Sequence, residues 1–148
     1  MKKALIIYGT TTGNTEMMAE TIKKEMEAAG VETELMEVTD ASVEDLSGEQ
    51  DVLLLGCPAY GDEEVELQED FAQFYEKVDG CGLDGANYAV FAPGDSSYTH
   101  FCGSVDMLEE KMESMGGNKV AVGLKIDGDP SDENEAITAW AMGIAFRM

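Results

Sequence analysis

One stretch of the chain concentrates residue types that bind phosphate. Four threonines, two glycines and an asparagine fill the seven residues from Gly9 to Thr15. This stretch follows an apolar run that ends at Tyr8, and it precedes a helical pattern that starts near Asn14. Unpaired N–H groups and the dipole at a helix N-terminus favour a bound anion. The loop has no Lys or Arg, so neutral donors would hold that anion.

The loop departs from two familiar phosphate-binding motifs. A Walker motif needs a lysine after Gly13, where the chain has Asn14, and the G-x-G-x-x-G spacing is also absent. So many hydroxyls favour a terminal phosphate monoester wrapped by N–H and O–H groups. The alternative is an ordinary capped helix start, which accounts less well for this composition.

Two further polar loops each carry a tyrosine. The second loop spans residues 57–68 and contains Tyr60, and the third spans residues 93–103 and contains Tyr98. If the three loops meet at one end of a sheet, the tyrosines flank a cleft with the phosphate at its back. Such a cleft suits a flat ring, although exposed loop tyrosines are also common on plain surfaces.

The pattern of strands supplies such a sheet. Continuous apolar runs are typical of strands covered on both faces, and alternating runs are typical of edge strands. The continuous runs lie at residues 5–7, 52–55 and 88–92, and the alternating runs at 31–35 and 119–126.

Helical patterns alternate with these strands. They lie at residues 14–29, 42–46, 67–78, after Gly103 to 116, and from Pro130 onward with Asp129 as the N-cap. The alternation predicts an α/β fold, a three-layer sandwich with a five-stranded parallel sheet of order 2-1-3-4-5 and helices on both faces. We expect one domain over residues 1–148. Ligands of such sheets bind beyond the carboxyl ends of strands one and three, where the three loops would converge.

The helical spacing also predicts which side chains face the core, Trp140 and the helical methionines among them. The expected inward positions are Met18, Ile22, Met26 and Ala29; Leu67, Phe71, Phe74, Tyr75 and Val78; Val105, Leu108, Met112 and Met115; and Ile137, Trp140, Ala141 and Ile144.

Composition narrows the function classes. Nine basic and 31 acidic residues give a net charge of −22, which argues against nucleic acid as a partner and favours a basic protein. No apolar stretch approaches the ~20 residues of a membrane span, so we expect no membrane partner and a cytoplasmic location.

The cysteines point to no metal site. Cys57, Cys81 and Cys102 are far apart and form neither a C-x-x-C pair nor a zinc spacing. Free thiols in a reducing compartment are the expected state. His100 is the single histidine, and no arginine follows a cysteine at phosphatase-like spacing, which disfavours a nucleophilic cysteine.

Taken together, the motifs resemble the flavodoxin family. The stretch from Ile7 to Glu16 resembles the FMN-phosphate loop, and residues 94–98 and 101–103 resemble the third flavin loop. Residues 55–58 and 67–68 bracket the second loop. The match runs over the whole chain, and no large insertion follows the last strand. The chain therefore resembles the short-chain flavodoxins of sulfate-reducing bacteria.

The resemblance implies a low-potential one-electron carrier with one non-covalent FMN, and not an enzyme. Such a carrier cycles mainly between semiquinone and hydroquinone and docks, as a monomer, to basic or positively patched redox proteins. Two alternatives stay open. An FMN-dependent NAD(P)H:quinone oxidoreductase would usually need a longer chain and a basic patch for the nucleotide. A receiver-like signalling module would need an acidic cluster after the first strand, where this chain has threonines.

The resemblance also assigns roles by position. Tyr98 would stack on one face of the flavin and Tyr60 on the other, where the family often has Trp. Asp95 would reach the ribityl chain or the pyrimidine edge. The phosphate contacts would come from Thr10, Thr11, Thr12, Gly13, Asn14 and Thr15, and the remaining ring contacts, mainly from the backbone, from Pro58, Ala59, Gly61, Asp62, Pro93, Gly94, His100, Phe101 and Cys102.

Two features would tune the redox potential. A peptide flip at Gly61 is cheap because glycine visits positive φ, and it could turn the Gly61 carbonyl toward a protonated flavin nitrogen. Acids near the loops would oppose an added negative charge, by roughly 0.3 kcal/mol each at ~12 Å in water and so by ~90 mV for six of them, before screening. These six are Asp62, Glu63, Glu64, Glu66, Asp70 and Asp95. Pro93 lacks an N–H, which would reduce the hydrogen bonds of the third loop.

Overall fold

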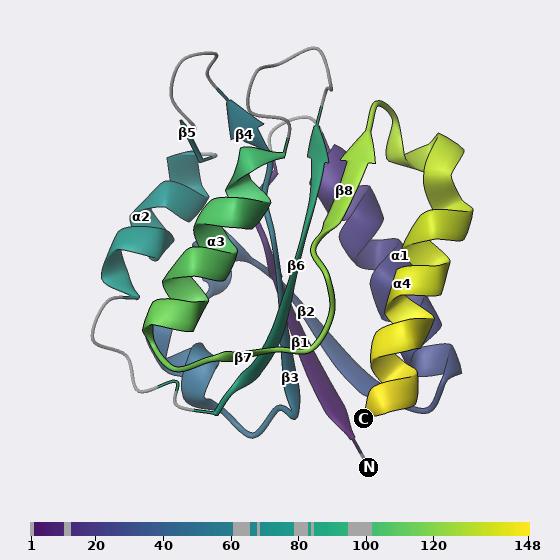
Figure 1. Ribbon diagram of the computed structural model, residues 1–148, viewed down its shortest axis with the longest axis horizontal. Helices are drawn as coiled ribbons and strands as arrows, with labels where there is room; N and C mark the ends of the chain where they lie inside the picture. The colour runs from purple at the N-terminus through teal and green to yellow at the C-terminus, as the bar shows by residue number, and fades with distance from the viewer. Residues whose placement is uncertain are drawn as a thin grey trace.

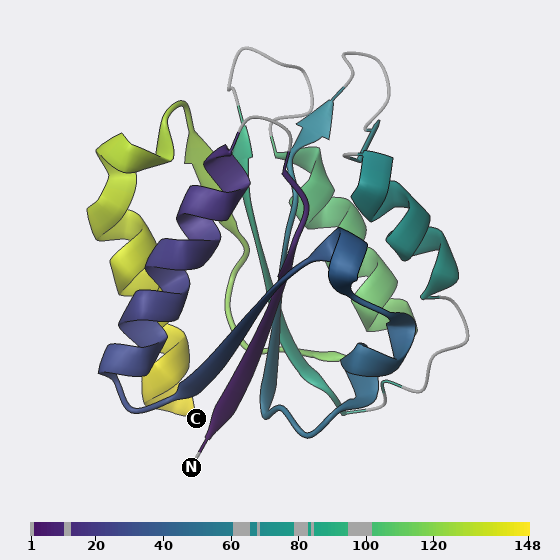
Figure 2. The ribbon, with the colours of Figure 1, turned by 180° about the vertical axis from the view of Figure 1, so that it is seen from behind.

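A parallel sheet lies between two layers of helices (Figures 1 and 2). The computed structural model describes residues 2–10, 13–60, 66–67, 69–78, 83, 85–94 and 102–148. Its strands are β1 (Lys3–Tyr8), β2 (Glu32–Glu37), β3 (Val52–Gly56), β4 (Ala59–Tyr60), β5 (Glu66–Leu67), β6 (Asn87–Gly94), β7 (Asn118–Lys119) and β8 (Leu124–Asp127). Its α-helices are α1 (Asn14–Ala28), α2 (Glu69–Lys77), α3 (Gly103–Ser114) and α4 (Asn134–Arg147), with 3₁₀ turns at Val38–Asp40, Val43–Ser47 and Pro130–Glu133.

The sheet has the predicted topology. Its order is β2-β1-β3-β6, and β7 and β8 both pair with β6, all in parallel. The order 2-1-3-4-5 is therefore confirmed, with β2 at one edge. The prediction of one continuous strand over residues 119–126 is wrong, because residues 120–123 separate β7 from β8. At Gly123 the backbone packs so closely on α3 that a Cβ atom would lie 2.3 Å from a methyl of Val105.

The two faces of the sheet explain its continuous apolar runs. Odd-numbered residues of β1 and β3 pack with α2 and α3, and even-numbered residues pack with α1 and α4. Both faces are thus buried, as the sequence predicted for parallel strands. The first core includes Leu5, Ile7, Leu53, Leu55, Phe71 and Leu108, and the second includes Ile6, Leu54, Phe91, Met18, Ile22 and Ile137.

The second long helix starts later than its apolar pattern predicts. Leu67 belongs to β5, which pairs antiparallel with β4 through Ala59 and Leu67, and α2 begins at Glu69. Placing Leu67 in the helix is therefore wrong, because a short hairpin takes up the residues before α2.

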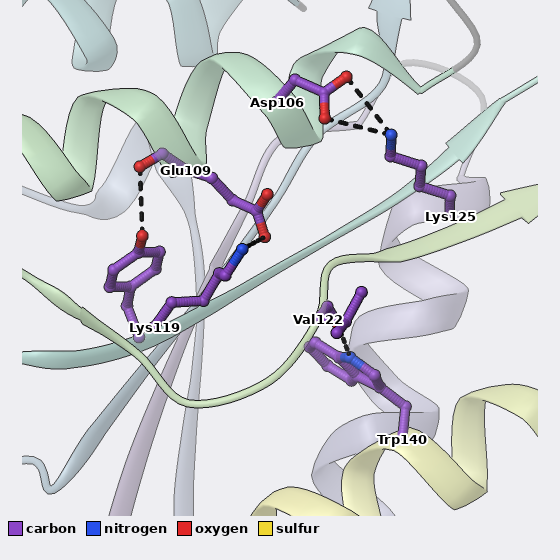
Figure 3. A network of polar contacts seen from close by, with 7 residues as sticks. Asp106, Glu109, Lys119, Val122, Lys125 and Trp140 are labelled. Carbon is purple, nitrogen blue, oxygen red and sulfur yellow. Dashed lines mark hydrogen bonds and ion pairs between the residues drawn. The ribbon is translucent and has the colours of Figure 1, made fainter.

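Several predicted core positions lie at the surface. Ala29 is exposed because α1 ends at Ala28 and the chain turns away at Gly30, whose φ is 89°. Met17 and Met142 are 38% and 53% exposed, so the helical methionines are not all core residues. Trp140 is half-buried: its ring packs edge-on against Phe91, and its indole N–H donates to the Val122 carbonyl at 2.7 Å (Figure 3).

Asp129 acts as the predicted cap, one turn ahead of α4. Its carboxylate accepts hydrogen bonds from the N–H and the hydroxyl of Ser131, both at 2.9 Å, and these bonds lower the pKa of Asp129. Pro130 begins the 3₁₀ turn, and α4 follows from Asn134. In the described part of the chain no helix is long and apolar enough to span a membrane.

Candidate functional site

The three predicted loops start from neighbouring strand ends at one edge of the sheet. β1 ends at Tyr8, β3 at Gly56 and β6 at Gly94. The Gly9 N–H donates to the Gly56 carbonyl at 2.9 Å, which ties the first loop to the start of the second. The helices that follow these loops all begin at this carboxyl edge (Figure 1). The strand ends thus meet as predicted.

The first loop turns sharply into α1. Gly13 precedes the helix with φ 91° and ψ −6°, a left-handed conformation that favours glycine. The Thr10 hydroxyl accepts a hydrogen bond from the Gly13 N–H at 3.0 Å, and so it shapes the turn from inside. Asn14 is half-buried at the first position of α1.

Thr15 is the decisive residue of this turn. It lies at the second position of α1 and is 1% exposed, and its hydroxyl has no hydrogen-bond partner in the described part of the chain. No side chain caps the N–H groups of this helix within those residues. A buried hydroxyl without a partner costs about 1–3 kcal/mol. The free hydroxyl and the uncapped N–H groups fit an anionic oxygen ligand.

The start of α3 is tied into the fold instead. Ser104, at its second position, is fully buried, and its hydroxyl donates to the Cys57 carbonyl at 2.7 Å. Cys102 precedes the helix with φ 49°, and its thiol donates to the Ala92 carbonyl at 3.5 Å. These bonds fix the start of the second loop against the third.

The described cysteines are buried thiols. Cys57 and Cys102 are free and buried, as the sequence predicted. Burial raises the pKa of Cys102 to about 11, with Lys125 acting in the opposite direction. The thiol is therefore protonated at neutral pH and unsuited to nucleophilic chemistry.

Pro93 and Gly94 lie in a strand rather than in a loop. Pro93 is buried in β6 opposite Ile126 of β8, and Gly94 lies opposite Asp127. The predicted start of the third loop at Pro93 is thus wrong. Beyond Phe91 the strand β6 no longer pairs with β3, so a proline without an N–H is tolerated there.

The remaining predicted site residues divide into two groups. Pro58 is half-buried after β3, and the backbones of Ala59 and Tyr60 form β4. The residues that lie outside the described part of the chain are Thr11, Thr12, Gly61, Asp62, Asp95, Tyr98, His100 and Phe101. Their roles stay predictions.

Two residues that shape the carboxyl edge of the sheet were not predicted from the sequence. Ser104 holds the second loop through the Cys57 carbonyl. Gly56 lets the ring of Phe91 approach, because a Cβ atom there would lie 2.3 Å from that ring. The sequence does show a small hydroxyl residue at Ser104 and a glycine, Gly56, at the end of an apolar run. It does not show that Ser104 bonds to Cys57 or that Gly56 contacts Phe91.

Charge is distributed unevenly along the strand axis. Acids occupy the first turns of the helices, at the carboxyl edge: Glu16, Glu69, Asp70, Asp106 and Glu135. Basic residues gather toward the other edge: Lys2, Lys3, Lys23, Lys24, Lys77, Lys111, Lys119 and Arg147. The remaining base, Lys125, pairs with Asp106 at 3.1 Å (Figure 3). Acids accompany the bases at that other edge, among them Glu27, Glu32, Glu49, Asp51, Glu76 and Glu113. The edge that carries the loops is therefore the more negative of the two, and the opposite edge is mixed in charge.

Comparison with known proteins agrees with this geometry. A family model for flavodoxins matches residues 6–140. The chain belongs to the flavodoxin family. It is 48% identical to a flavodoxin of Maridesulfovibrio salexigens, over all of both chains, and 43% identical to one of Nitratidesulfovibrio vulgaris, over 95% of each. The solved structure of oxidised Flavodoxin 2 from Bacillus cereus matches with a TM-score of 0.92 and 32% identity, over 99% of each chain.

Membership confirms the resemblance to short-chain flavodoxins and decides between the alternatives. Flavodoxins bind FMN and carry electrons between other proteins, and they are not enzymes. The quinone-oxidoreductase and receiver alternatives are therefore set aside. The unpartnered Thr15 hydroxyl and the open start of α1 fit the phosphate of FMN, which is an anionic monoester.

Proposed function

We propose that this chain is a low-potential, one-electron carrier that acts as a monomer of one domain over residues 1–148 in the cytoplasm. Its FMN, held without a covalent bond, supplies the electron chemistry by cycling mainly between semiquinone and hydroquinone. Basic or positively patched redox proteins are its partners. The observation that carries the proposal is the buried Thr15 hydroxyl at the start of α1, which has no hydrogen-bond partner in the described part of the chain.

The first loop and the start of α1 would hold the phosphate. Thr15 offers its buried hydroxyl, and the first turn of α1 offers N–H groups that no side chain caps within the described residues. Thr10 and Gly13 set the turn through their hydrogen bond, and Asn14 begins the helix beside them. By family position, Thr11 and Thr12 complete this cradle.

The second and third loops would hold the ring. We assign Tyr60 and Tyr98 to its two faces and Asp95 to the ribityl chain or the pyrimidine edge. Backbone groups of residues 58–62 and 100–102, in the order of the family motif, would bond to its polar atoms. Gly61 would tune the first electron step, and replacing Gly61 with Ala should lower that potential while FMN stays bound.

The negative edge would make the reduced carrier a stronger reductant. Glu69 and Asp70 are exposed in the first turn of α2. Two acids at ~12 Å in water oppose an added electron by roughly 30 mV before screening. The same field would steer basic partners toward this edge, and salt would weaken the steering.

Neutralisation at the two ends of the molecule tests the proposal. One variant carries Glu69→Gln and Asp70→Asn, and a control with the same net charge carries Glu27→Gln and Glu113→Gln near the other ends of α1 and α3. Potentiometry on both FMN-loaded proteins should show a higher second potential, by roughly 10–30 mV, in the α2 variant alone. Electron transfer to a basic c-type cytochrome should also slow most in that variant.

Equal shifts in both variants would mean that net charge, and not the negative edge, sets the potential. An unchanged second potential in the α2 variant would remove the electrostatic account. Failure to bind FMN would overturn the proposal as a whole.

A further inference from the structure

The hairpin of β4 and β5 is separate from the main sheet. Its two strands form a small sheet of their own, in which Ala59 pairs with Leu67 and Tyr60 pairs with Glu66. The hairpin lies at the carboxyl edge, near the start of α2 (Figure 1). A two-stranded hairpin is only marginally stable by itself in water. Its position therefore depends on how the residues that flank it are attached to the rest of the fold.

The chain between β3 and the hairpin is attached at two consecutive carbonyls. The Gly56 carbonyl accepts a hydrogen bond from the Gly9 N–H at 2.9 Å, and the Cys57 carbonyl accepts one from the Ser104 hydroxyl at 2.7 Å. Ser104 and Cys57 are both fully buried, and they are 47 residues apart in the sequence. Ser104 thus ties the chain, two residues before β4, to the start of α3.

The start of α3 is a firm anchor for this hydrogen bond. The Val105 N–H donates to the Cys102 carbonyl at 3.0 Å, and the Cys102 thiol donates to the Ala92 carbonyl of β6 at 3.5 Å. Val105 is fully buried and packs closely against Gly123. The residues on both sides of Ser104 are therefore fixed to the main sheet and its core, and the Ser104 hydroxyl passes that constraint on to the hairpin.

We propose that Ser104 is a positioning residue for the first electron step, which it influences through the hairpin. This inference rests on the proposed function, in which backbone groups of residues 58–62 bond to the flavin and Gly61 tunes that step. The middle of this segment is β4. A hydrogen bond weakens steeply as its geometry departs from the ideal. The position of the hairpin therefore determines how well its backbone groups can bond to the flavin, while Ser104 itself touches no reacting atom.

Two other roles for the Ser104 hydroxyl predict different results. A hydroxyl that only stabilises the fold would change the free energy of unfolding and leave both redox potentials unchanged. A hydroxyl that serves the phosphate would change the preference for FMN over riboflavin. A positioning role predicts a change in the first potential while FMN stays bound.

Potentiometry of the FMN-loaded protein tests the inference with Ser104→Ala. The product of the first electron step should be stabilised about 3–10-fold less, which lowers the first potential by ~30–60 mV. Ser104→Cys keeps a weaker donor, and its first potential should lie between those of Ser104→Ala and the parent chain.

Ser114→Ala is the matched control on the same helix. It removes a hydroxyl that donates to the Lys111 carbonyl at 2.6 Å, at the other end of α3. Its first potential should equal that of the parent chain.

Amide hydrogen exchange of the apoprotein tests the positioning without the cofactor. At short labelling times, peptides that cover residues 57–67 should exchange about 3–10-fold faster in Ser104→Ala than in the parent chain. Ser114→Ala should leave their exchange unchanged. Unchanged exchange in Ser104→Ala would overturn the inference, because the hydroxyl would then not hold the hairpin.

A double-mutant cycle with Gly61→Ala tests the route through the hairpin. Ser104→Ala should shift the first potential by much less in the Gly61→Ala protein than in the parent chain. Additive shifts would overturn the inference, and so would an unchanged first potential in Ser104→Ala or an equal shift in Ser114→Ala. Failure of the parent chain to bind FMN would instead overturn the proposed function, and hydrogen exchange of the apoprotein would still decide whether Ser104 holds the hairpin.

Discussion

Helices α1 and α3 have similar N-terminal ends but differ in the hydrogen bonding of the buried hydroxyl there. Each follows a parallel strand at the carboxyl edge, and each is preceded by a residue at positive φ, Gly13 at 91° and Cys102 at 49°. Each has a buried hydroxyl residue at its second position, Thr15 or Ser104. Within the described residues the Ser104 hydroxyl donates to the Cys57 carbonyl, and the Thr15 hydroxyl has no partner.

This difference distinguishes the proposed phosphate site at the start of α1 from a structural contact at the start of α3. We call that contact the α3 clamp: the hydrogen bonds from Ser104 to the Cys57 carbonyl and from Cys102 to the Ala92 carbonyl. A buried hydroxyl with a carbonyl partner contributes to stability, whereas a buried hydroxyl without one costs free energy. Under the proposed function, the FMN phosphate would supply the acceptor that the Thr15 hydroxyl lacks at α1, whereas the Ser104 hydroxyl already has an acceptor at α3. The comparison therefore favours the start of α1 over the start of α3 as the proposed phosphate site.

Thr15→Val gives the largest expected effect and acts with opposite signs on binding and on stability. Loss of a hydrogen bond to a charged phosphate should weaken FMN binding by about 10–100-fold. The apoprotein should be as stable as before or slightly more stable, because the change removes an unpartnered buried hydroxyl without changing the side-chain shape. Fluorescence titration with FMN and urea unfolding of the apoprotein measure the two effects.

Thr15→Ser is the matched control, because it keeps the hydroxyl. It should bind FMN within a few-fold of the parent chain. A clearly destabilised Thr15→Val apoprotein would show that the hydroxyl already has a partner in the fold, and the comparison with α3 would then fail.

Ser104→Ala should act in the opposite way. It removes the hydrogen bond that the Ser104 hydroxyl donates to the Cys57 carbonyl at a fully buried position, so the free energy of unfolding should fall by about 1–2 kcal/mol. FMN binding should change by only a few-fold, since Ser104 serves the clamp. Urea unfolding of the apoprotein measures the loss. A large loss of FMN affinity without a loss of stability would assign Ser104 to the cofactor instead.

Alkaline pH tests the clamp at α3 through Cys102. Its pKa of about 11 in the folded state lies above the ordinary value of 9.0. The unfolded thiol therefore ionises first as pH rises, so the stability is fully present below about pH 9 and falls toward pH 11. At about pH 10 the loss should be about 1.4 kcal/mol. Thermal unfolding of the parent chain and of Cys102→Ala across this range should differ in slope, and equal slopes would contradict the buried thiol.

Periodicity predicted the sheet because its strands are buried on both faces. Leu53 and Leu54 point into different cores, and a continuous apolar run is what such a strand requires. The break between β7 and β8 was not predictable from periodicity, because the apolar residues continue between the two strands, where Gly123 packs closely on Val105 of α3. The prediction that Leu67 begins a helix failed because Leu67 pairs with Ala59 in the β4–β5 hairpin, in spite of its helical spacing.

The candidate site was predictable where it depends on local chemistry. The glycine and hydroxyl density before Asn14 predicted a phosphate loop, which stays a prediction, and it also predicted a tight turn, which Gly13 makes with its positive φ. The difference in hydrogen bonding between Thr15 and Ser104 could not be predicted from the sequence, because both are small hydroxyl residues near a helix start. It depends on the Cys57 carbonyl, which the fold brings from 47 residues away.

Removing the phosphate from the ligand tests the central claim most directly. Riboflavin is FMN without its phosphate, so the ratio of the two affinities measures what the phosphate site contributes. Isothermal titration of the apoprotein, Thr15→Val and Ser104→Ala with both ligands should give a large preference for FMN in the parent chain. That preference should fall by about 10–100-fold in Thr15→Val and persist in Ser104→Ala. An equal preference in all three proteins would contradict the assignment of the phosphate to the start of α1.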